Sequence, residues 1–158
     1  MTLRRLQQPW AAAALVLLAG ACGGSAPMRA QGARFSSRPD PDERELAGKK
    51  ALVVLEGEAT YYSDSLAGNH TAGGDRYDPA RLTAASRDLP FDSIVRVTRR
   101  DTGAHVLVRI NDRGPFGKKR RILDLSRAAA ARLGILKRGT TEVRAEVLVL
   151  GKQRNKRR

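Results

Sequence analysis

The stretch Arg109–Phe116 (RINDRGPF) contains the residues of this sequence that are best suited to chemistry. It follows a segment in which apolar and polar residues alternate, as in a strand, and its Asn-Asp-Arg cluster is followed at once by Gly114–Pro115. A carboxylate on a loop at a strand end, fixed by a rigid sheet, is often a working acid. Asp112 is therefore a candidate acid, although an isolated Asp-Arg-Gly is more often a turn in which the Asp side chain bonds nearby N–H groups.

Short apolar and alternating segments on both sides of this stretch predict the strands that would position Asp112. They cover residues 51–62, 82–85, 93–98, 105–110, 122–125 and 142–150. Ser126 is a predicted N-cap of the helix Arg127–Leu133, which ends at Gly134, and residues 63–78 predict a long loop. Several short strands, long loops and one small helix indicate a mainly β protein built as a small barrel of mixed connectivity.

Seven motifs occur in an order and spacing that resemble the rare lipoprotein A (RlpA) family. They are Gly57–Tyr62 (GEATYY), Thr71–Asp78 (TAGGDRYD), Leu82–Ala85 (LTAA), Leu89–Phe91 (LPF), Val95–Thr98 (VRVT), Val108–Phe116 (VRINDRGPF) and Ile122–Ser126 (ILDLS). The resemblance covers about residues 57–150. It implies a six-stranded double-psi β-barrel. It also implies endolytic cleavage of peptidoglycan glycan strands by a lytic transglycosylase, with a preference for strands stripped of stem peptides.

The resemblance also implies roles for individual residues. Asp112 matches the family's acid, and Asp75 matches a second family acid that is commonly Glu. The residues that we expect to bind the glycan are Tyr61, Tyr62, Ser86, Asn111 and Arg113. Ser86 stands where the family usually has a His, and a hydroxyl cannot accept a proton near neutral pH as imidazole can. This departure bears on whether the chain is fully active, and His70, in the loop that also contains Asp75, is the alternative imidazole.

Cleavage of this kind needs no water nucleophile, because the C6 hydroxyl of the muramic acid attacks its own anomeric carbon. We expect a protonated Asp112 to donate to the glycosidic oxygen and then to accept the proton of that hydroxyl, which leaves a 1,6-anhydro end. Asp75 is the anion available to stabilise the oxocarbenium-like centre. Arg113 would favour an ionised Asp112, so it must point away from the carboxylate or bind the substrate instead.

A rival hypothesis is a binding module that grips or loosens glycan strands without cutting them, as expansin-type barrels do. Metal and cofactor chemistry is not expected, because two histidines and one cysteine have no zinc-site spacing and the sequence has no phosphate-binding glycine loop. The formal net charge of +14 favours a polyanionic partner. Nucleic acid is the poor choice, because the N-terminus directs the chain out of the cytoplasm and only three Tyr and three Phe could stack on bases.

The N-terminus has the features of a bacterial lipoprotein signal. Arg4 and Arg5 precede the apolar run 11–19, and small residues lead to Cys22, the only cysteine. The run is shorter than the roughly 20 apolar residues of a membrane span, and a buried helix is disfavoured because low-complexity sequence follows it. LAGAC resembles the lipobox, with Ala19 where a large aliphatic residue is usual. Ordinary signal cleavage is therefore the alternative to lipidation of Cys22.

The chain is expected to divide into four parts. These are the signal peptide 1–21, a flexible linker 22–48, the barrel domain 49–151 and a basic tail 152–158. A lipid on Cys22 would anchor the protein at the periplasmic face of the cell envelope, and Gly23 after it favours the outer membrane. The basic cluster 118–121 either is a solvated turn or grips anionic wall polymer, and we expect a monomer whose partner is the glycan.

Overall fold

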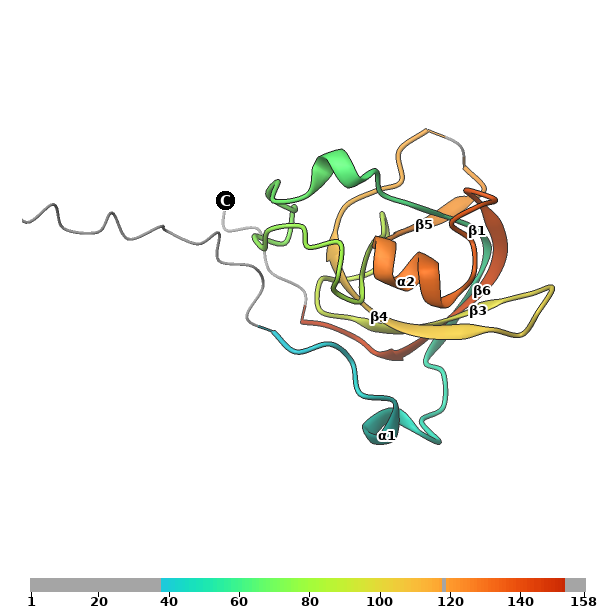
Figure 1. Cartoon of the computed structure of the whole chain (residues 1–158). Helices are drawn as coiled ribbons and strands as arrows, with labels where there is room; N and C mark the ends of the chain where they lie inside the picture. Colours follow the sequence, from blue (N-terminus) through green and yellow to red (C-terminus); the bar gives the residue numbers. More distant parts are fainter. Residues whose placement is uncertain (1–37, 118, 153–158) are drawn as a thin grey trace, which may run out of the picture. The chain divides into compact units, whose positions relative to one another are not determined.

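Six strands form a closed barrel in the computed structural model, which describes residues 38–117 and 119–152 (Figure 1). The strands are β1 (Val53–Tyr61), β2 (Thr83–Ala85), β3 (Ile94–Arg99), β4 (His105–Asp112), β5 (Arg121–Leu125) and β6 (Thr141–Val149). Two short α-helices, α1 (Glu43–Leu46) and α2 (Arg127–Arg132), and the 3-10 helix η1 (Asp64–Leu66) accompany them. The predicted mainly β, six-stranded barrel is confirmed, and each predicted strand segment overlaps an observed strand.

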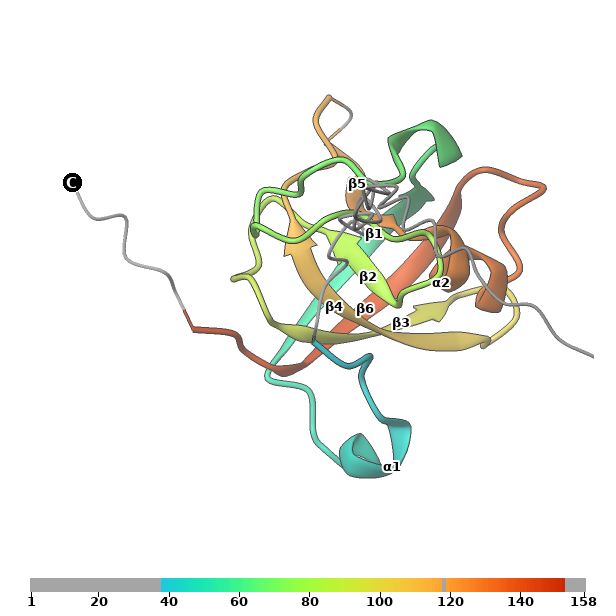
Figure 2. The same ribbon diagram turned by 60° about the vertical axis from the view of Figure 1, so that its left-hand side comes forward.

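The strand order explains how residues far apart in the sequence come together. Around the barrel the order is β1-β5-β2-β4-β3-β6, and β6 pairs with β1 to close it. The pairs β1–β5 and β2–β4 are parallel, and the other four pairs are antiparallel. Figure 2 shows β2 between β4 and β5. The short strand β2 thus separates β4 from β5, two strands that follow one another in the sequence but do not pair with each other.

Strand β4 separates the apolar core from a polar outer face. Val106, Val108 and Ile110 belong to the hydrophobic core inside the barrel. Successive side chains of a strand point to opposite faces, so Arg109 and Asn111 lie on the outer face of β4. Both are nevertheless buried, because a loop covers them. Because both side chains are polar and buried, hydrogen bonds and ion pairs are concentrated at this end of β4.

The predicted helix is also confirmed, and α2 has the expected start. The Ser126 side chain accepts a hydrogen bond from the Ala129 N–H at 3.3 Å, which satisfies one of the free donors of the first turn. Gly134 follows the helix with φ of +69°, a conformation that glycine adopts without strain. Ala129 and Ala130 are fully buried in the barrel core, so α2 contributes to the same core as the strands.

Residues 38–48 differ from the flexible linker that was expected for 22–48. Leu46 of α1 is only 5% exposed and packs against Leu107 and Leu148 on the outer surface of the barrel. Asp40 accepts a hydrogen bond from the backbone N–H of Leu82 at 3.0 Å. An apolar outer patch on β4 and β6, which the strand alternation did not single out, is the physical reason for this docking.

The predicted signal peptide, the lipidation site Cys22, the first part of the linker, Lys118 and most of the basic tail lie outside the described residues. Within the described part of the chain, no helix is long and apolar enough to span a membrane.

Candidate active site

A row of side chains crosses four neighbouring strands at the ends of β1, β5, β2 and β4. Thr60 pairs with Asp124, Asp124 with Ala85, and Ala85 with Asp112. The register between β2 and β4 shifts after Ala84, and this irregularity places Asp112 opposite Ala85. Two strand spacings correspond to roughly 10 Å between the Cα atoms of Asp112 and Asp124. Two carboxyl groups therefore flank the small methyl group of Ala85.

Asp112 is held by three hydrogen-bond donors from three different segments. Its Oδ1 accepts the backbone N–H of Ala72 at 2.7 Å and that of Arg113 at 2.8 Å. Its Oδ2 accepts the Tyr62 hydroxyl at 2.8 Å. Acceptance at both oxygens suits an ionised carboxylate, which has lone pairs and no proton to offer. This arrangement differs from the expectation of a protonated Asp112 and favours a base or an electrostatic stabiliser at this position.

Asp124 is the carboxyl group that sequence reasoning missed. It is half-buried, and the Thr60 hydroxyl donates a hydrogen bond to it. Burial raises the pKa of Asp124 above its usual range, and the negative charge of Asp112 raises it further, while Arg121 acts in the opposite direction. The signal in the sequence was a single Asp in the apolar strand motif ILDLS. Asp124 is thus suited to keep its proton to a higher pH than an ordinary Asp carboxyl.

The two adjacent tyrosines at the end of β1, Tyr61 in the strand and Tyr62 just after it, make different contacts. Burial, and then the hydrogen bond to Asp112, raise the pKa of Tyr62, so its hydroxyl stays protonated and donates to the carboxylate. The Tyr62 ring lies 4.9 Å from the Tyr77 ring, between centroids. Tyr61 packs against the hydrophobic core, and its hydroxyl donates to the Leu136 carbonyl at 2.9 Å. The structure therefore brings Tyr62 to Asp112 but assigns Tyr61 a packing role, in place of the predicted glycan contact.

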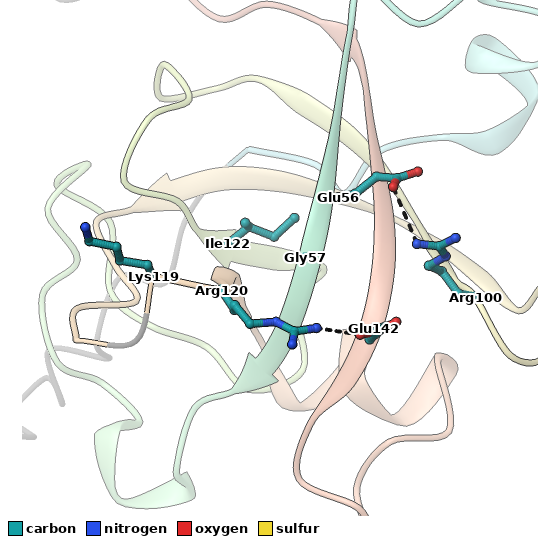
Figure 3. A pocket seen from close by; sticks show the side chains of 7 residues that line it. All are labelled: Glu56, Gly57, Arg100, Lys119, Arg120, Ile122 and Glu142. Atoms are coloured by element: carbon teal, nitrogen blue, oxygen red, sulfur yellow. Dashed lines mark hydrogen bonds and ion pairs between the residues drawn. The ribbon is translucent and has the colours of Figure 1, made fainter.

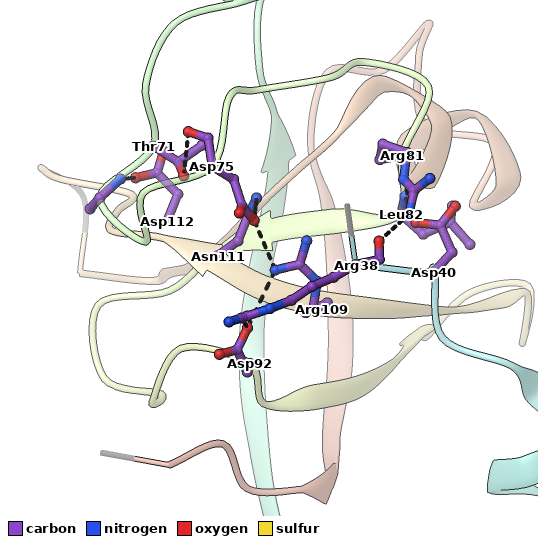
Figure 4. A network of polar contacts seen from close by, with 11 residues as sticks. Arg38, Asp40, Thr71, Asp75, Arg81, Leu82, Asp92, Arg109, Asn111 and Asp112 are labelled. Carbon is purple, nitrogen blue, oxygen red and sulfur yellow. Dashed lines mark hydrogen bonds and ion pairs between the residues drawn. The ribbon is translucent and has the colours of Figure 1, made fainter. Parts of the chain in front are cut away.

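Asp75 lies on the outer face of β4, in the polar network that also contains Asp112 (Figure 4). Its Oδ2 accepts a charge-assisted hydrogen bond from Arg109 at 2.9 Å and a longer one from the Asn111 side chain at 3.4 Å. Arg109 is 5% exposed and also contacts Asp92 at 3.4 Å. Asp75 is thus paired with a buried cation, which reduces its value as a free anion for a cationic reaction centre.

The loop that contains Asp75 also supplies a donor to Asp112. The Thr71 N–H donates to the Asp75 carbonyl at 2.8 Å, and the Gly73 N–H donates to the Asn111 carbonyl at 2.9 Å. A Cβ on Gly73 would stand 2.4 Å from that carbonyl oxygen, so only glycine allows this approach. The loop is therefore closed on itself at Thr71 and fastened to β4 through Gly73, next to the point where Ala72 meets Asp112.

Comparison with known proteins identifies the family. The family model described as "Lytic transglycolase" matches residues 54–145, which include the whole row from Thr60 to Asp124. The chain belongs to the RlpA family. It is 47% identical over 113 residues to the endolytic peptidoglycan transglycosylase RlpA of Neisseria meningitidis, covering 67% of this chain and 47% of the relative. It is 44% identical over 114 residues to that of Vibrio cholerae, covering 68% of this chain and 43% of the relative.

This RlpA-family chain spans about half the length of the curated relatives it matches. Among solved structures, the Streptomyces papain inhibitor is similar, with a TM-score of 0.50 and 24% identity over 61% of this chain and 94% of the inhibitor. That likeness concerns the barrel fold alone. Within the described residues, no group of three or more His, Cys, Asp or Glu side chains could hold a metal ion.

Ser86 and Arg113, which were expected to bind the glycan, both make contacts within the protein. Ser86 is 1% exposed, and its hydroxyl accepts the N–H groups of Asp88 and Leu89 in the following turn. The Arg113 guanidinium donates to the carbonyls of Ser86, Leu89 and, at 3.5 Å, Asp112, and it lies over the Phe91 ring. Ser86 thus has almost no exposed surface for a sugar, whereas glycan binding by the partly exposed Arg113 stays a prediction.

The remaining predicted residues are placed as follows. Asn111 is buried beneath the loop and orients Asp75, so it has no surface to offer a sugar. His70 is exposed and pairs through its backbone with Arg76, and it makes no recorded contact with Asp112 among the described residues. His70 therefore does not supply, next to Asp112, the imidazole that the family resemblance led us to expect.

Tyr62→Phe tests the Tyr62 contact in this RlpA-family site. Loss of the hydroxyl removes one of three donors to Asp112, so we expect activity to fall about tenfold, with a loss of roughly 1 kcal/mol in the free energy of unfolding. Product release and thermal unfolding measure the two effects. Tyr61→Phe is the matched control, since its hydroxyl bonds a carbonyl away from Asp112. Equal activity losses in both variants would contradict a specific role for Tyr62.

Proposed function

We propose that this chain cleaves peptidoglycan glycan strands as a lytic transglycosylase. The observation that carries the proposal is the pair of unlike carboxyl groups, Asp112 and Asp124, on either side of Ala85. One accepts three hydrogen bonds, and the other is half-buried with a raised pKa. Two carboxyls whose surroundings separate their proton affinities are the usual basis for dividing acid and base roles. Membership of the RlpA family supports the same reaction.

The two carboxyl groups divide the proton transfers of the reaction. Asp124 donates its proton to the glycosidic oxygen as the bond from that oxygen to the anomeric carbon of the muramic acid breaks. The C6 hydroxyl of the same sugar then bonds to the anomeric carbon and gives its proton to Asp112. The products are a 1,6-anhydro end and a free hydroxyl on the other sugar. A proton passing from Asp112 to Asp124 through water restores the starting state.

Asp112 also stabilises positive charge during this sequence. An oxocarbenium-like centre forms between the departure of the glycosidic oxygen and ring closure, and a preorganised carboxylate stabilises such a centre without further rearrangement. The three donors keep Asp112 in place for this purpose. Asp75, which was expected to supply this charge, instead fastens the loop whose Ala72 N–H orients Asp112.

The place of action follows from the proposed substrate. Peptidoglycan lies in the cell envelope, so the protein works there, on the periplasmic side. We propose that lipidation of Cys22 holds it at a membrane, most simply the outer membrane, and that it acts as a monomer on strands stripped of stem peptides. Mass spectrometry of the protein recovered from envelopes would detect the diacylated Cys22 as the N-terminal residue; an unmodified N-terminus beyond Cys22 would contradict the anchor.

Incubation of the purified protein with sacculi tests the activity itself. We expect soluble fragments with 1,6-anhydro-muramic ends, and more of them after an amidase has removed the stem peptides. Mass spectrometry identifies the fragments, because an anhydro end is lighter by one water than a hydrolysed end. Pelleting with sacculi without any released fragments would instead indicate the rival function, a glycan-binding module.

A further inference from the structure

One aromatic side chain near the carboxyl pair is exposed to solvent. Phe116 is 78% exposed, more than any other large apolar residue of the described chain. The loop that carries it borders Asp124, because a Cβ on Gly114, two residues before Phe116, would stand 3.7 Å from Asp124 Oδ2. Single exposed apolar residues are common and need no explanation by themselves. The position of this one, beside two candidate catalytic carboxyls, is the feature to be explained.

The described residues between β4 and β5, 113–117 and 119–120, are fastened to the barrel at both ends. At their start, Arg113 donates to the carbonyls of Ser86 and Leu89 at 3.2 and 3.0 Å. At their end, Arg87 donates to the Lys119 and Arg121 carbonyls at 3.2 and 3.1 Å. These contacts hold the base of the loop against the barrel while Phe116 faces solvent. A fixed loop base limits the entropy lost when the Phe116 ring binds a partner.

A cation on the same loop also faces outward. Lys119 lines a cavity of about 220 Å³ on the outer surface of the barrel (Figure 3). Two other cations of this cavity are already paired, Arg100 with Glu56 at 3.4 Å and Arg120 with Glu142 at 2.7 Å. Within the described residues, Lys119 forms no ion pair, and in Figure 3 it is drawn apart from both pairs. Its charge is therefore available to an external anion.

We infer that Phe116 and Lys119 form a glycan-binding subsite next to the cleaved bond. The flat ring of Phe116 packs against the C–H face of a sugar, a contact that aromatic rings make at low entropic cost. Lys119 pairs with the lactyl carboxylate of a muramic acid, which becomes free when a stem peptide is removed. The subsite rests on the proposed function for its substrate. It adds the residues that would select a carboxylate-bearing, peptide-free strand.

Phe116→Ala tests the stacking contact. With stripped glycan strands as substrate, we expect KM to rise about tenfold with little change in kcat, because the contact is present equally in the bound and transition states. Phe116→Trp should keep the wild-type KM, whereas Phe116→Leu should not, since it preserves apolar character without a flat face. Leu52→Ala, which truncates another exposed apolar residue, is the control. A wild-type KM in Phe116→Ala would overturn the subsite.

Lys119→Gln tests the carboxylate contact separately. Binding to stripped muramic-containing strands should weaken about threefold, the typical size for an exposed ion pair, and binding to chitin oligosaccharides, which have no carboxylate, should not change. Phe116→Ala should weaken both. Equal effects of Lys119→Gln on the two glycans would contradict the lactyl contact.

Pelleting assays separate the subsite from the proposed activity. If the wild-type protein releases no anhydro ends but Phe116→Ala pellets less with stripped sacculi, the activity fails and the subsite stands. If the wild-type protein cleaves the strands, and Phe116→Ala equals it in both cleavage and pelleting, the subsite is wrong and the proposed activity stands. Absence of wild-type binding would overturn both.

Discussion

Asp112→Asn is expected to lower the release of anhydro-ended fragments by about 10²- to 10⁴-fold, the range that a positioned acid or base contributes. The amide oxygen can still accept the two backbone N–H groups that Oδ1 accepts, with its NH2 group facing the Tyr62 oxygen, but the amide can neither take up the C6 hydroxyl proton nor stabilise a cation by its charge. The barrel should remain folded, because Asp112 lies at the end of β4 outside the hydrophobic core. Fragment release from amidase-treated sacculi and thermal unfolding measure the two properties.

Asp75→Asn is the matched comparison for Asp112→Asn. It makes the same change of an Asp carboxylate to an amide, but in the neighbouring loop. Arg109 retains its contact with Asp92 in this variant. We expect a smaller loss of activity, about tenfold, accompanied by a lower melting temperature because the loop is less firmly attached. If Asp75→Asn abolishes fragment release at an unchanged melting temperature, Asp75 is a catalytic residue and its assignment as a loop anchor is wrong.

Asp124→Asn is the second change with a large expected effect. Without a proton to donate to the glycosidic oxygen, we expect a loss of activity comparable to that of Asp112→Asn. In the wild-type protein the rate should fall as the pH rises through the pKa of Asp124, because the acid must be protonated. Residual activity in Asp124→Asn should lack this decline. An unchanged pH profile in Asp124→Asn would show that another group supplies the proton.

The same substitution should stabilise the fold at neutral pH. Burial raises the pKa of Asp124 in the folded state above its unfolded value of about 4, so folding favours the protonated form. The stability that this group contributes is fully present below the unfolded pKa and is lost as the pH rises through the folded pKa. Asp124→Asn removes the cost of a buried charge above that range, a gain on the order of 1 kcal/mol that is typical of active-site substitutions. A melting temperature at pH 7 below that of the wild type would contradict this account.

The strands could be predicted from the sequence because they are short apolar or alternating segments bounded by turn residues. The same pattern predicted Asp112 at a strand end, and the family resemblance supplied the barrel. The pairing of Asp112 with Asp124 could not be predicted in this way. It depends on the register shift after Ala84 and on β2 lying between β4 and β5, and both follow from tertiary packing.

Side-chain directions were a second limit of the sequence. Tyr61 and Tyr62 are adjacent and chemically identical, and only the strand register decides that Tyr62 faces Asp112. Arg113 lies next to Asp112 in the sequence, yet its guanidinium contacts three backbone carbonyls and the Phe91 ring in place of the Asp112 carboxylate. Leu46 docks on an outer apolar patch that involves strands far from it in the sequence, so local composition suggested a linker.

Closure of the barrel has a consequence for when the protein can be active. The four strands that carry Thr60, Ala85, Asp112 and Asp124 are brought into register only when the whole ring of strands has formed. Such long-range pairings make folding slow relative to helical proteins, since distant segments must meet before any contact is gained. A partly synthesised or partly translocated chain contains every reactive side chain but no assembled centre. We therefore expect the proposed cleavage of glycan strands to begin only after the last strand, β6, has paired with β1 and β3 and closed the barrel.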